Sequence, residues 1–159
     1  MFQQLDYSGE KTKDYELLIK QLDALSTGET NQTALLANAS SLLNHFLDDI
    51  NWVGFYLSEN EELVLGPFQG LPACIRIPFG KGVCGTAVSE NKTQRIADVH
   101  QFPGHIACDG ASKSEIVIPI SRNNNIIGVL DIDSPIHDRF DVADQEGLEK
   151  FVTQLEKHL

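Results

Sequence analysis

Cys108 lies in a stretch of small and polar residues, HIACDGASKSEIVIPI, which runs from His105 to Ile120 and ends as an apolar strand. Most free cysteines are buried as small apolar side chains, whereas a thiol on a loop can reach a substrate. Glu115 stands at the start of the strand, seven residues after the thiol. A sulfur nucleophile followed closely by a carboxyl group indicates chemistry that needs both a nucleophile and a proton donor.

Two further carboxylates belong to the next strand, GVLDIDS. Asp131 and Asp133 point to the same face of that strand because side chains alternate along it. Asparagines at positions 123, 124 and 125 separate the two strands, and asparagine tolerates the left-handed backbone that tight turns need. A three-residue turn sets Glu115 opposite Asp133, whereas a two-residue turn moves Glu115 to the other face of the sheet.

We predict the three-residue turn, in which Arg122 pairs with Ile126. The same register sets Val117 opposite Asp131. It also gathers one apolar face, made of Ile116, Ile118, Ile120, Leu130 and Ile132. Three carboxylates that face one another cost stability unless water, a cation or shared protons relieve the repulsion. The pattern therefore fits either a solvated acidic face or a site whose acids hold protons near neutral pH.

His100 and His105 open two other interpretations of the Cys108 loop. Together with Cys108 they form an irregular H-x4-H-x2-C pattern that could hold zinc. Either histidine could instead act as the base of a Cys-His nucleophile.

Trp52 is the only tryptophan and lies in the predicted strand NWVGFY, where it shares one face with Gly54 and Tyr56. These aromatic side chains either pack in the core or form a wall for an apolar part of a substrate.

Helices are predicted from apolar periodicity on both sides of the strands. One helix is expected over Asp14–Leu25, and a second follows an N-cap at Thr30 or Asn31. A closing amphipathic helix is expected from Phe140 to Leu159, with Asp141 as a possible N-cap.

Short strands are predicted in the middle of the chain. A hairpin is expected from Asn51 to Gly70, with further strands at CIRIPF and TQRIADV. GKGVCG matches the dinucleotide fingerprint, but antiparallel hairpins follow it, so it predicts a tight turn into a short helix. The order predicts one α+β domain over residues 1–159: two N-terminal helices, a central antiparallel sheet from about residue 51, and a C-terminal helix from about residue 141.

The composition limits the range of possible functions and cellular compartments. Twelve basic and 23 acidic residues give a formal charge of −11, which disfavours binding to nucleic acid or to an anionic membrane surface. The N-terminus lacks the pattern of a signal peptide, so the cytoplasm is the expected compartment. Cys74, Cys84 and Cys108 are too few and too widely spaced for a secreted disulfide framework. Four roles remain possible for these cysteines: buried apolar residues, metal ligands, a nucleophile or a redox relay.

Five blocks together resemble the free methionine-(R)-sulfoxide reductases, which are single-domain GAF proteins. The blocks are NWVGFYL, LVLGPFQGLPACIRIPFGKGVCGTA, the Cys108 loop, SEIVIPI and GVLDIDSP. The resemblance implies reduction of free L-methionine-(R)-sulfoxide to L-methionine. It implies no bound cofactor and no metal, electrons from NADPH through thioredoxin reductase and thioredoxin, and a homodimer.

The resemblance also implies roles for the cysteines. Cys108 would attack the sulfoxide sulfur and become a sulfenic acid, Cys74 would resolve it as a disulfide, and Cys84 could take part in the relay. The substrate would be bound by Trp52, Glu115, Asp131 and Asp133. Tyr56 is added to this set of binding residues because it shares a strand face with Trp52. Either Glu115 or Asp133 could protonate the sulfoxide oxygen.

Two other functions are weighed against the reductase. One is a non-catalytic GAF sensor module that binds a small molecule or senses oxidation, and the other is a zinc-binding regulator.

Overall fold

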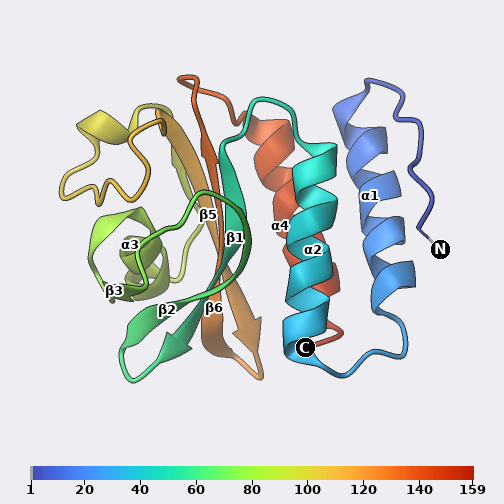
Figure 1. Ribbon diagram of the computed structural model, residues 1–159, viewed down its shortest axis with the longest axis horizontal. Coiled ribbons are helices and arrows are strands. Elements are labelled where there is room, and N and C mark those ends of the chain that lie inside the picture. Colours follow the sequence, from blue (N-terminus) through green and yellow to red (C-terminus); the bar gives the residue numbers. More distant parts are fainter. Residues whose placement is uncertain (1) are drawn as a thin grey trace.

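Strands that are far apart in the sequence meet in one antiparallel sheet at the centre of the molecule (Figure 1). The computed structural model describes residues 2–159. The strands of the sheet are β1 (Trp52–Glu59), β2 (Glu62–Gly70), β3 (Arg76–Pro78), β4 (Gln94–Ile96), β5 (Ser114–Arg122) and β6 (Asn125–Ser134). Their order is β3-β2-β1-β6-β5-β4, with every neighbouring pair antiparallel. The predicted α+β class with a central antiparallel sheet is confirmed.

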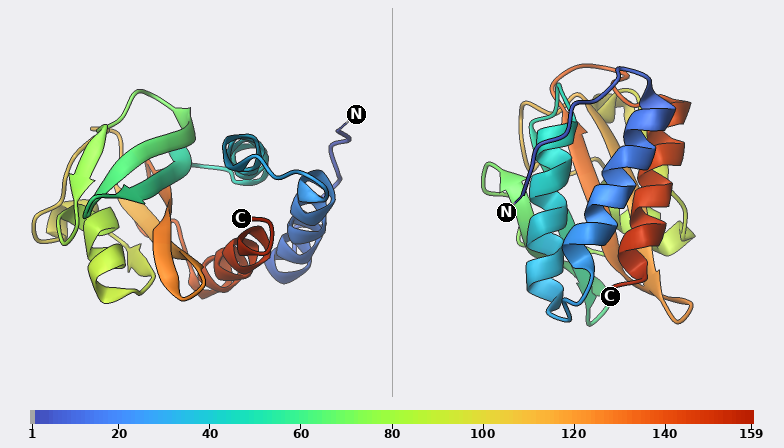
Figure 2. Two further views of the ribbon diagram at one scale, coloured as in Figure 1. Left: turned by 90° about the horizontal axis from the view of Figure 1, so that it is seen from below. Right: turned by 90° about the vertical axis from the view of Figure 1, so that its right-hand side faces the viewer.

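The helices lie on both sides of this sheet. They are α1 (Lys11–Ser26), α2 (Gln32–Phe46), α3 (Gly82–Glu90) and α4 (Val142–Glu156), and a single 3₁₀ turn follows β4 (Val99–Gln101). Figures 1 and 2 show α2 and α4 against one face of the sheet, α1 outside them, and α3 on the opposite face. The sheet therefore separates an apolar, helix-covered side from a second side that α3 covers only in part.

Side-chain caps fix where two of the helices begin. The side chain of Asn31 accepts a hydrogen bond from the backbone N–H of Ala34 at 3.0 Å, as one of the two predicted caps requires. Asp141 and Asp144 form a reciprocal capping box at the start of α4. This helix runs from Val142 to Glu156 and is shorter at both ends than the predicted span, because the cap sets its start and its last turn ends before Leu159.

The larger core lies between the sheet and the helices. The predicted apolar face of β5 and β6 packs there against α2 and α4, with Val53 and Phe55 of β1 beside it. Tyr15 of α1 is buried, and its hydroxyl donates a 2.8 Å hydrogen bond to Asp144. A side chain at Gly147 of α4 would collide with the Tyr15 ring, so α1 and α4 approach closely at this point.

The turn between β5 and β6 differs from the prediction. It contains two residues, Asn123 and Asn124, both with left-handed backbone (φ 52° and 62°). Arg122 pairs with Asn125 instead of Ile126. Two successive left-handed residues match the twist of the flanking strands, so this sequence prefers the shorter turn.

A bulge in β6 compensates for the short turn. Ser121 pairs with Ile126 and Ile120 with Gly128, so Ile127 is an extra residue on β6. Beyond the bulge, Glu115 faces Asp133 as predicted. The predicted register of the acidic face is therefore correct, although the predicted turn is wrong.

The glycine-rich segment before α3 is a tight connection from strand to helix. Gly82 has a left-handed backbone (φ +61°), and a side chain at Gly85 would collide with the carbonyl of Pro78. These glycines permit a sharp turn from β3 into α3, as the sequence predicts.

Candidate active site

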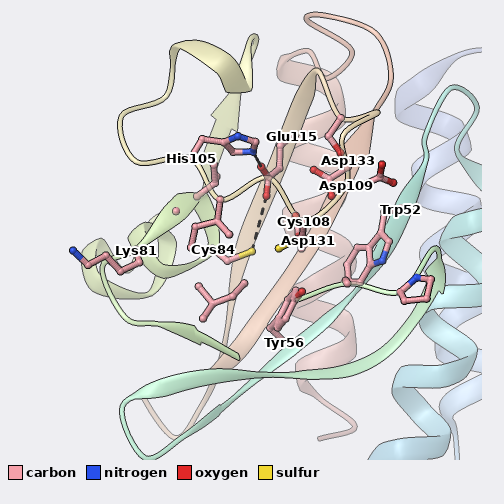
Figure 3. A pocket seen from close by; sticks show the side chains of 17 residues that line it. Trp52, Tyr56, Lys81, Cys84, His105, Cys108, Asp109, Glu115, Asp131 and Asp133 are labelled. Carbon is pink, nitrogen blue, oxygen red and sulfur yellow. Dashed lines mark hydrogen bonds and ion pairs between the residues drawn. The ribbon is translucent and has the colours of Figure 1, made fainter. Parts of the chain in front are cut away.

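A pocket opens on the face of the sheet that α3 covers (Figure 3). Its walls come from β1, β5, β6, the start of α3 and the loops before β3 and β5. Seven of the eight predicted site residues line it: Trp52, Tyr56, Cys84, Cys108, Glu115, Asp131 and Asp133. The eighth, Cys74, reaches the pocket through its bond to Cys108.

The three carboxyl groups meet because of the strand register. Glu115 pairs with Asp133 across β5 and β6, and Asp131 shares the face of Asp133 two residues earlier. Burial raises the pKa of Glu115 well above its usual range, and the charges of Asp131 and Asp133 raise it further. Burial likewise raises the pKa values of Asp131 and Asp133. The cluster is therefore a proton-holding site and not a solvated acidic face.

Aromatic side chains of β1 form the wall opposite the Cys84 side of the pocket. The Trp52 ring stacks between Tyr56 and Phe68, with centroids 5.8 Å and 5.2 Å away. Its indole N–H donates to the carbonyl of Leu71 at 3.1 Å, which fixes the plane of the ring. A side chain at Gly54 would collide with Phe68, so glycine is needed where β1 and β2 hold this stack.

Cys74 and Cys108 form a disulfide, with Cα atoms 5.5 Å apart. The bond joins the segment before β3 to the loop before β5. The Tyr56 hydroxyl donates a 2.8 Å hydrogen bond to the carbonyl of Cys74, so a residue of the aromatic wall also anchors the disulfide. The pairing that the resemblance implied is present.

Cys84 is a free, buried cysteine. Its Sγ lies 4.0 Å from Oε1 of Glu115 (dashed in Figure 3). Burial raises the pKa of its thiol well above the usual range, and the neighbouring acids Asp131 and Glu115 raise it further. Cys84 therefore holds its proton at neutral pH and is a poor nucleophile there.

His105 is a pocket residue whose place the sequence did not reveal. Its Nε2 lies 3.9 Å from Oε2 of Glu115, and its side chain is 13% exposed. Burial lowers its pKa, and His100 lowers it further, so the neutral imidazole faces a protonated carboxyl group. The alternative zinc set of His100, His105 and Cys108 does not form: Cys108 is bonded to Cys74, and His100 groups with Asp98 and His137.

The loop that carries Cys108 is tied to the sheet by Asn51. The Asn51 side-chain N–H donates to Asp109 Oδ2 at 2.9 Å and to Ser112 Oγ at 3.1 Å. Its backbone N–H donates to the carbonyl of Asp133 at 2.9 Å. Sequence reasoning missed this tie, although Asp109 offers a local signal, since its carboxylate accepts from the backbone N–H of Ala111 as turn-forming aspartates do.

The sequence and the fold match a known class of domain. The GAF domain family matches residues 31–159. The free methionine-R-sulfoxide reductase of Escherichia coli is 60% identical over 94% of this chain and 90% of its own. The family model and the Escherichia coli protein both match the helices as well as the sheet.

Solved structures of similar proteins have the same fold. The reduced form of the fRMsr of Staphylococcus aureus is 59% identical, covers 99% of both chains and superposes with a TM-score of 0.90. The free methionine-R-sulfoxide reductase of Neisseria meningitidis, in complex with its substrate, is 41% identical over 99% of this chain and 95% of its own, with a TM-score of 0.95. The chain belongs to the free methionine-R-sulfoxide reductases, a family of GAF-domain enzymes. In residues 2–159, no helix combines the length and apolarity that crossing a membrane requires.

Proposed function

We propose that the pocket reduces free L-methionine-(R)-sulfoxide to L-methionine by cysteine chemistry. The observation that carries this proposal is the Cys74–Cys108 disulfide at a pocket whose floor holds Glu115, Asp131 and Asp133. A disulfide beside a proton-holding acid cluster has the parts that sulfoxide reduction needs: a nucleophile, a proton donor and a resolving thiol.

The walls of the pocket suit the two ends of the substrate. The stacked indole of Trp52 offers an apolar surface for the S-methyl group. Asp131 is 6% exposed, and its Oδ1 is buried without a hydrogen-bond partner in residues 2–159. A buried acceptor without a donor is costly, and the α-ammonium group of a free amino acid supplies donors and charge. A peptide-bound methionine has no such ammonium group, so the pocket favours the free amino acid.

The first half-reaction transfers the sulfoxide oxygen to the protein. Cys108 Sγ attacks the sulfoxide sulfur while Glu115 or Asp133 protonates the oxygen, because a sulfoxide oxygen leaves poorly without a proton. An Sγ–S bond forms as the S–O bond of the substrate breaks and the protonated oxygen departs as hydroxide. The hydroxide then attacks Cys108 Sγ, the Sγ–S bond breaks, methionine leaves, and Cys108 becomes a sulfenic acid. The sulfoxide is thereby reduced by two electrons to methionine, and Cys108 is oxidised by two.

The second half-reaction closes the disulfide. The thiol of Cys74 attacks the Cys108 sulfenic acid, an S–S bond forms and water leaves. We assign recycling to thioredoxin, whose dithiol reduces the bond and becomes a disulfide itself, with NADPH and thioredoxin reductase behind it. Cys84 lies outside this bond as a free, buried thiol, and its part in the relay stays a prediction.

The test is an assay that separates the epimers. With thioredoxin, thioredoxin reductase and NADPH, the protein should oxidise NADPH with the free R epimer and only poorly with the S epimer or with a peptide-bound sulfoxide. No NADPH oxidation with the free R epimer rejects the proposal.

Two cysteine variants test the assigned roles. Cys108→Ser should abolish even a single turnover, measured as methionine formed per enzyme without a reductant. Cys74→Ser should still form about one methionine per enzyme and then stall with thioredoxin. Full activity of Cys108→Ser would show that another group is the nucleophile.

The family resemblance further supports a homodimer in the reducing cytoplasm. Ile136 and Val142 are exposed apolar side chains available to such an interface. Light scattering of the purified protein tests the dimer, and a monomer at all concentrations excludes it.

A further inference from the structure

The side of the pocket nearest α3 brings together a thiol and two carboxyl groups. Cys84 comes from α3, Glu115 from β5 and Asp131 from β6, and one donor atom of each lies within 4.8 Å of the other two. All three residues are buried. Figure 3 shows Cys84 and Glu115 pointing toward each other, with the contact between them dashed.

We propose that Cys84, Glu115 and Asp131 bind a thiophilic divalent cation, foremost Zn²⁺, through one thiolate sulfur and two carboxylate oxygens. The fourth position of the ion faces the pocket. The ion then occupies the region that the ammonium group of the substrate needs, so it inhibits the reductase. The inhibition rests on the proposed function, whereas the binding does not.

The distances suit a tetrahedral ion after a small contraction. With Zn–S of about 2.3 Å and Zn–O of about 2.1 Å, neighbouring ligands of a tetrahedral ion lie roughly 3.4–3.6 Å apart. Cys84 Sγ and Glu115 Oε1 are 4.0 Å apart without an ion. Rotations of side chains bring such a pair to the required spacing, so neither the sheet nor α3 needs to move.

A second observation points to a missing cation. Asp131 Oδ1 is buried and has no hydrogen-bond donor in residues 2–159. No lysine or arginine of these residues forms an ion pair with Asp131 or Glu115, and the nearest basic group is His105, whose Nε2 lies 3.9 Å from Glu115 Oε2. Buried carboxyl groups are normally paired with donors or coordinate metals, and here one oxygen does neither.

The donor set selects the kind of ion. A thiolate ligand favours soft or borderline ions such as Zn²⁺ over Mg²⁺ and Ca²⁺, which take six or more oxygens. Binding releases the protons that Cys84 and the acids hold, because the thiolate and the carboxylates are the ligands. Three ligands and an open position are the arrangement in which zinc keeps an exchangeable site.

The disulfide makes a clean test possible. In the oxidised protein, Cys74 and Cys108 are bonded, so Cys84 is the only thiol. We would titrate this form with Co²⁺, which replaces zinc and gives a thiolate-to-cobalt charge-transfer absorption when sulfur coordinates it. Wild type should show this absorption, and Zn²⁺ should abolish it by displacement.

Variants decide whether the three residues form the site. Cys84→Ala should lose the absorption, and Asp131→Asn should weaken Co²⁺ binding by about tenfold or more. His137→Ala is the matched control: it removes one member of the exposed Asp98, His100 and His137 group, which contains no sulfur, and should leave the absorption unchanged. Circular dichroism checks that each variant is folded.

Two results would overturn the site: no charge-transfer absorption in the folded wild type, or an absorption that survives in both Cys84→Ala and Asp131→Asn. The inhibition is measured separately, as methionine formed in a single turnover of the reduced protein with and without Zn²⁺. Zn²⁺ should slow wild type and leave Cys84→Ala at its own metal-free rate. If Co²⁺ binds as expected but Zn²⁺ does not slow turnover, the inhibition is wrong and the site stands.

Discussion

Glu115 faces Asp133 across β5 and β6 because Ile127 stands outside the ladder as a bulge. The two-residue turn at Asn123 and Asn124 by itself would pair Glu115 with Ile132 and turn its carboxyl group toward the apolar core. A bulge three residues after Asn124 thus decides which face of the sheet becomes acidic.

Deleting Ile127 should remove the bulge but keep the acidic face, because Gly128 would still pair with Ile120 and Glu115 with Asp133. Deleting Ile126 and Ile127 together should instead destroy the site, since the same two-residue turn would then pair Glu115 with Ser134. Either Glu115 or the acids of β6 would enter the apolar core, where a buried unpaired carboxyl group costs about 3 kcal/mol or more. Thermal unfolding and the epimer assay measure both effects. Loss of activity in the single deletion, or full activity and stability in the double deletion, would contradict this account of the register.

Glu115→Gln should make the protein more stable at alkaline pH while it impairs turnover. The pKa of Glu115 is raised in the folded state, so between its unfolded and folded pKa values the native protein binds more protons than the unfolded chain. The free energy of unfolding then falls as pH rises through that window, by about 1.4 kcal/mol per pH unit at most. Glutamine carries no such cost. Urea unfolding should show little difference near about pH 4 and a clear gain for the variant near about pH 8, and equal differences at both pH values would refute the cause.

Asn51→Asp should loosen the loop that carries Cys108. The new carboxylate would face that of Asp109 at a site where an amide N–H now donates at 2.9 Å, and like charges repel. We expect KM for the sulfoxide to rise about tenfold, since the loop closes the pocket. The Cys74–Cys108 bond should also form more slowly after a single turnover, as followed by thiol labelling. Asn51→Ala removes the donor without the repulsion and should have a smaller effect. An unchanged rate of disulfide formation in Asn51→Asp would mean that the tie does not position the loop.

Gly147→Ala should destabilise the protein without altering the chemistry. The added methyl group would collide with the Tyr15 ring, where α1 and α4 meet on the helix-covered side of the sheet. Overpacking of this kind costs about 1–3 kcal/mol, which denaturant unfolding measures. The specific activity of the folded variant should equal that of wild type, because the pocket lies on the other face. A stability within experimental error of wild type would show that the two helices can separate at no cost.

Local chemistry made much of this fold predictable. Asn31 and Asp141 cap helices because their side chains bond to backbone N–H groups within three residues, and sequence displays that spacing. Alternation along β6 likewise put Asp131 and Asp133 on one face. The bulge at Ile127 was not predictable, because it depends on a balance between turn geometry and burial over the whole hairpin. The tie from Asn51 to Asp109 spans 58 residues and exists only once β1 lies beside β6. The Cys74–Cys108 pairing was implied by family resemblance, since spacing alone left every pairing open.

The short reach between Cys74 and Cys108 has a protective consequence. A sulfenic acid that meets peroxide advances to a sulfinic acid, from which most proteins do not return. With Cα atoms 5.5 Å apart, Cys74, in the resolving role proposed for it, can consume the sulfenic acid without a large movement of the chain. While the bond is closed, neither sulfur is a thiolate, which is the form that oxidants attack. The oxidative conditions that generate methionine sulfoxide therefore leave the enzyme as a disulfide that a dithiol can reduce. The disulfide form thus also protects both cysteines from irreversible oxidation.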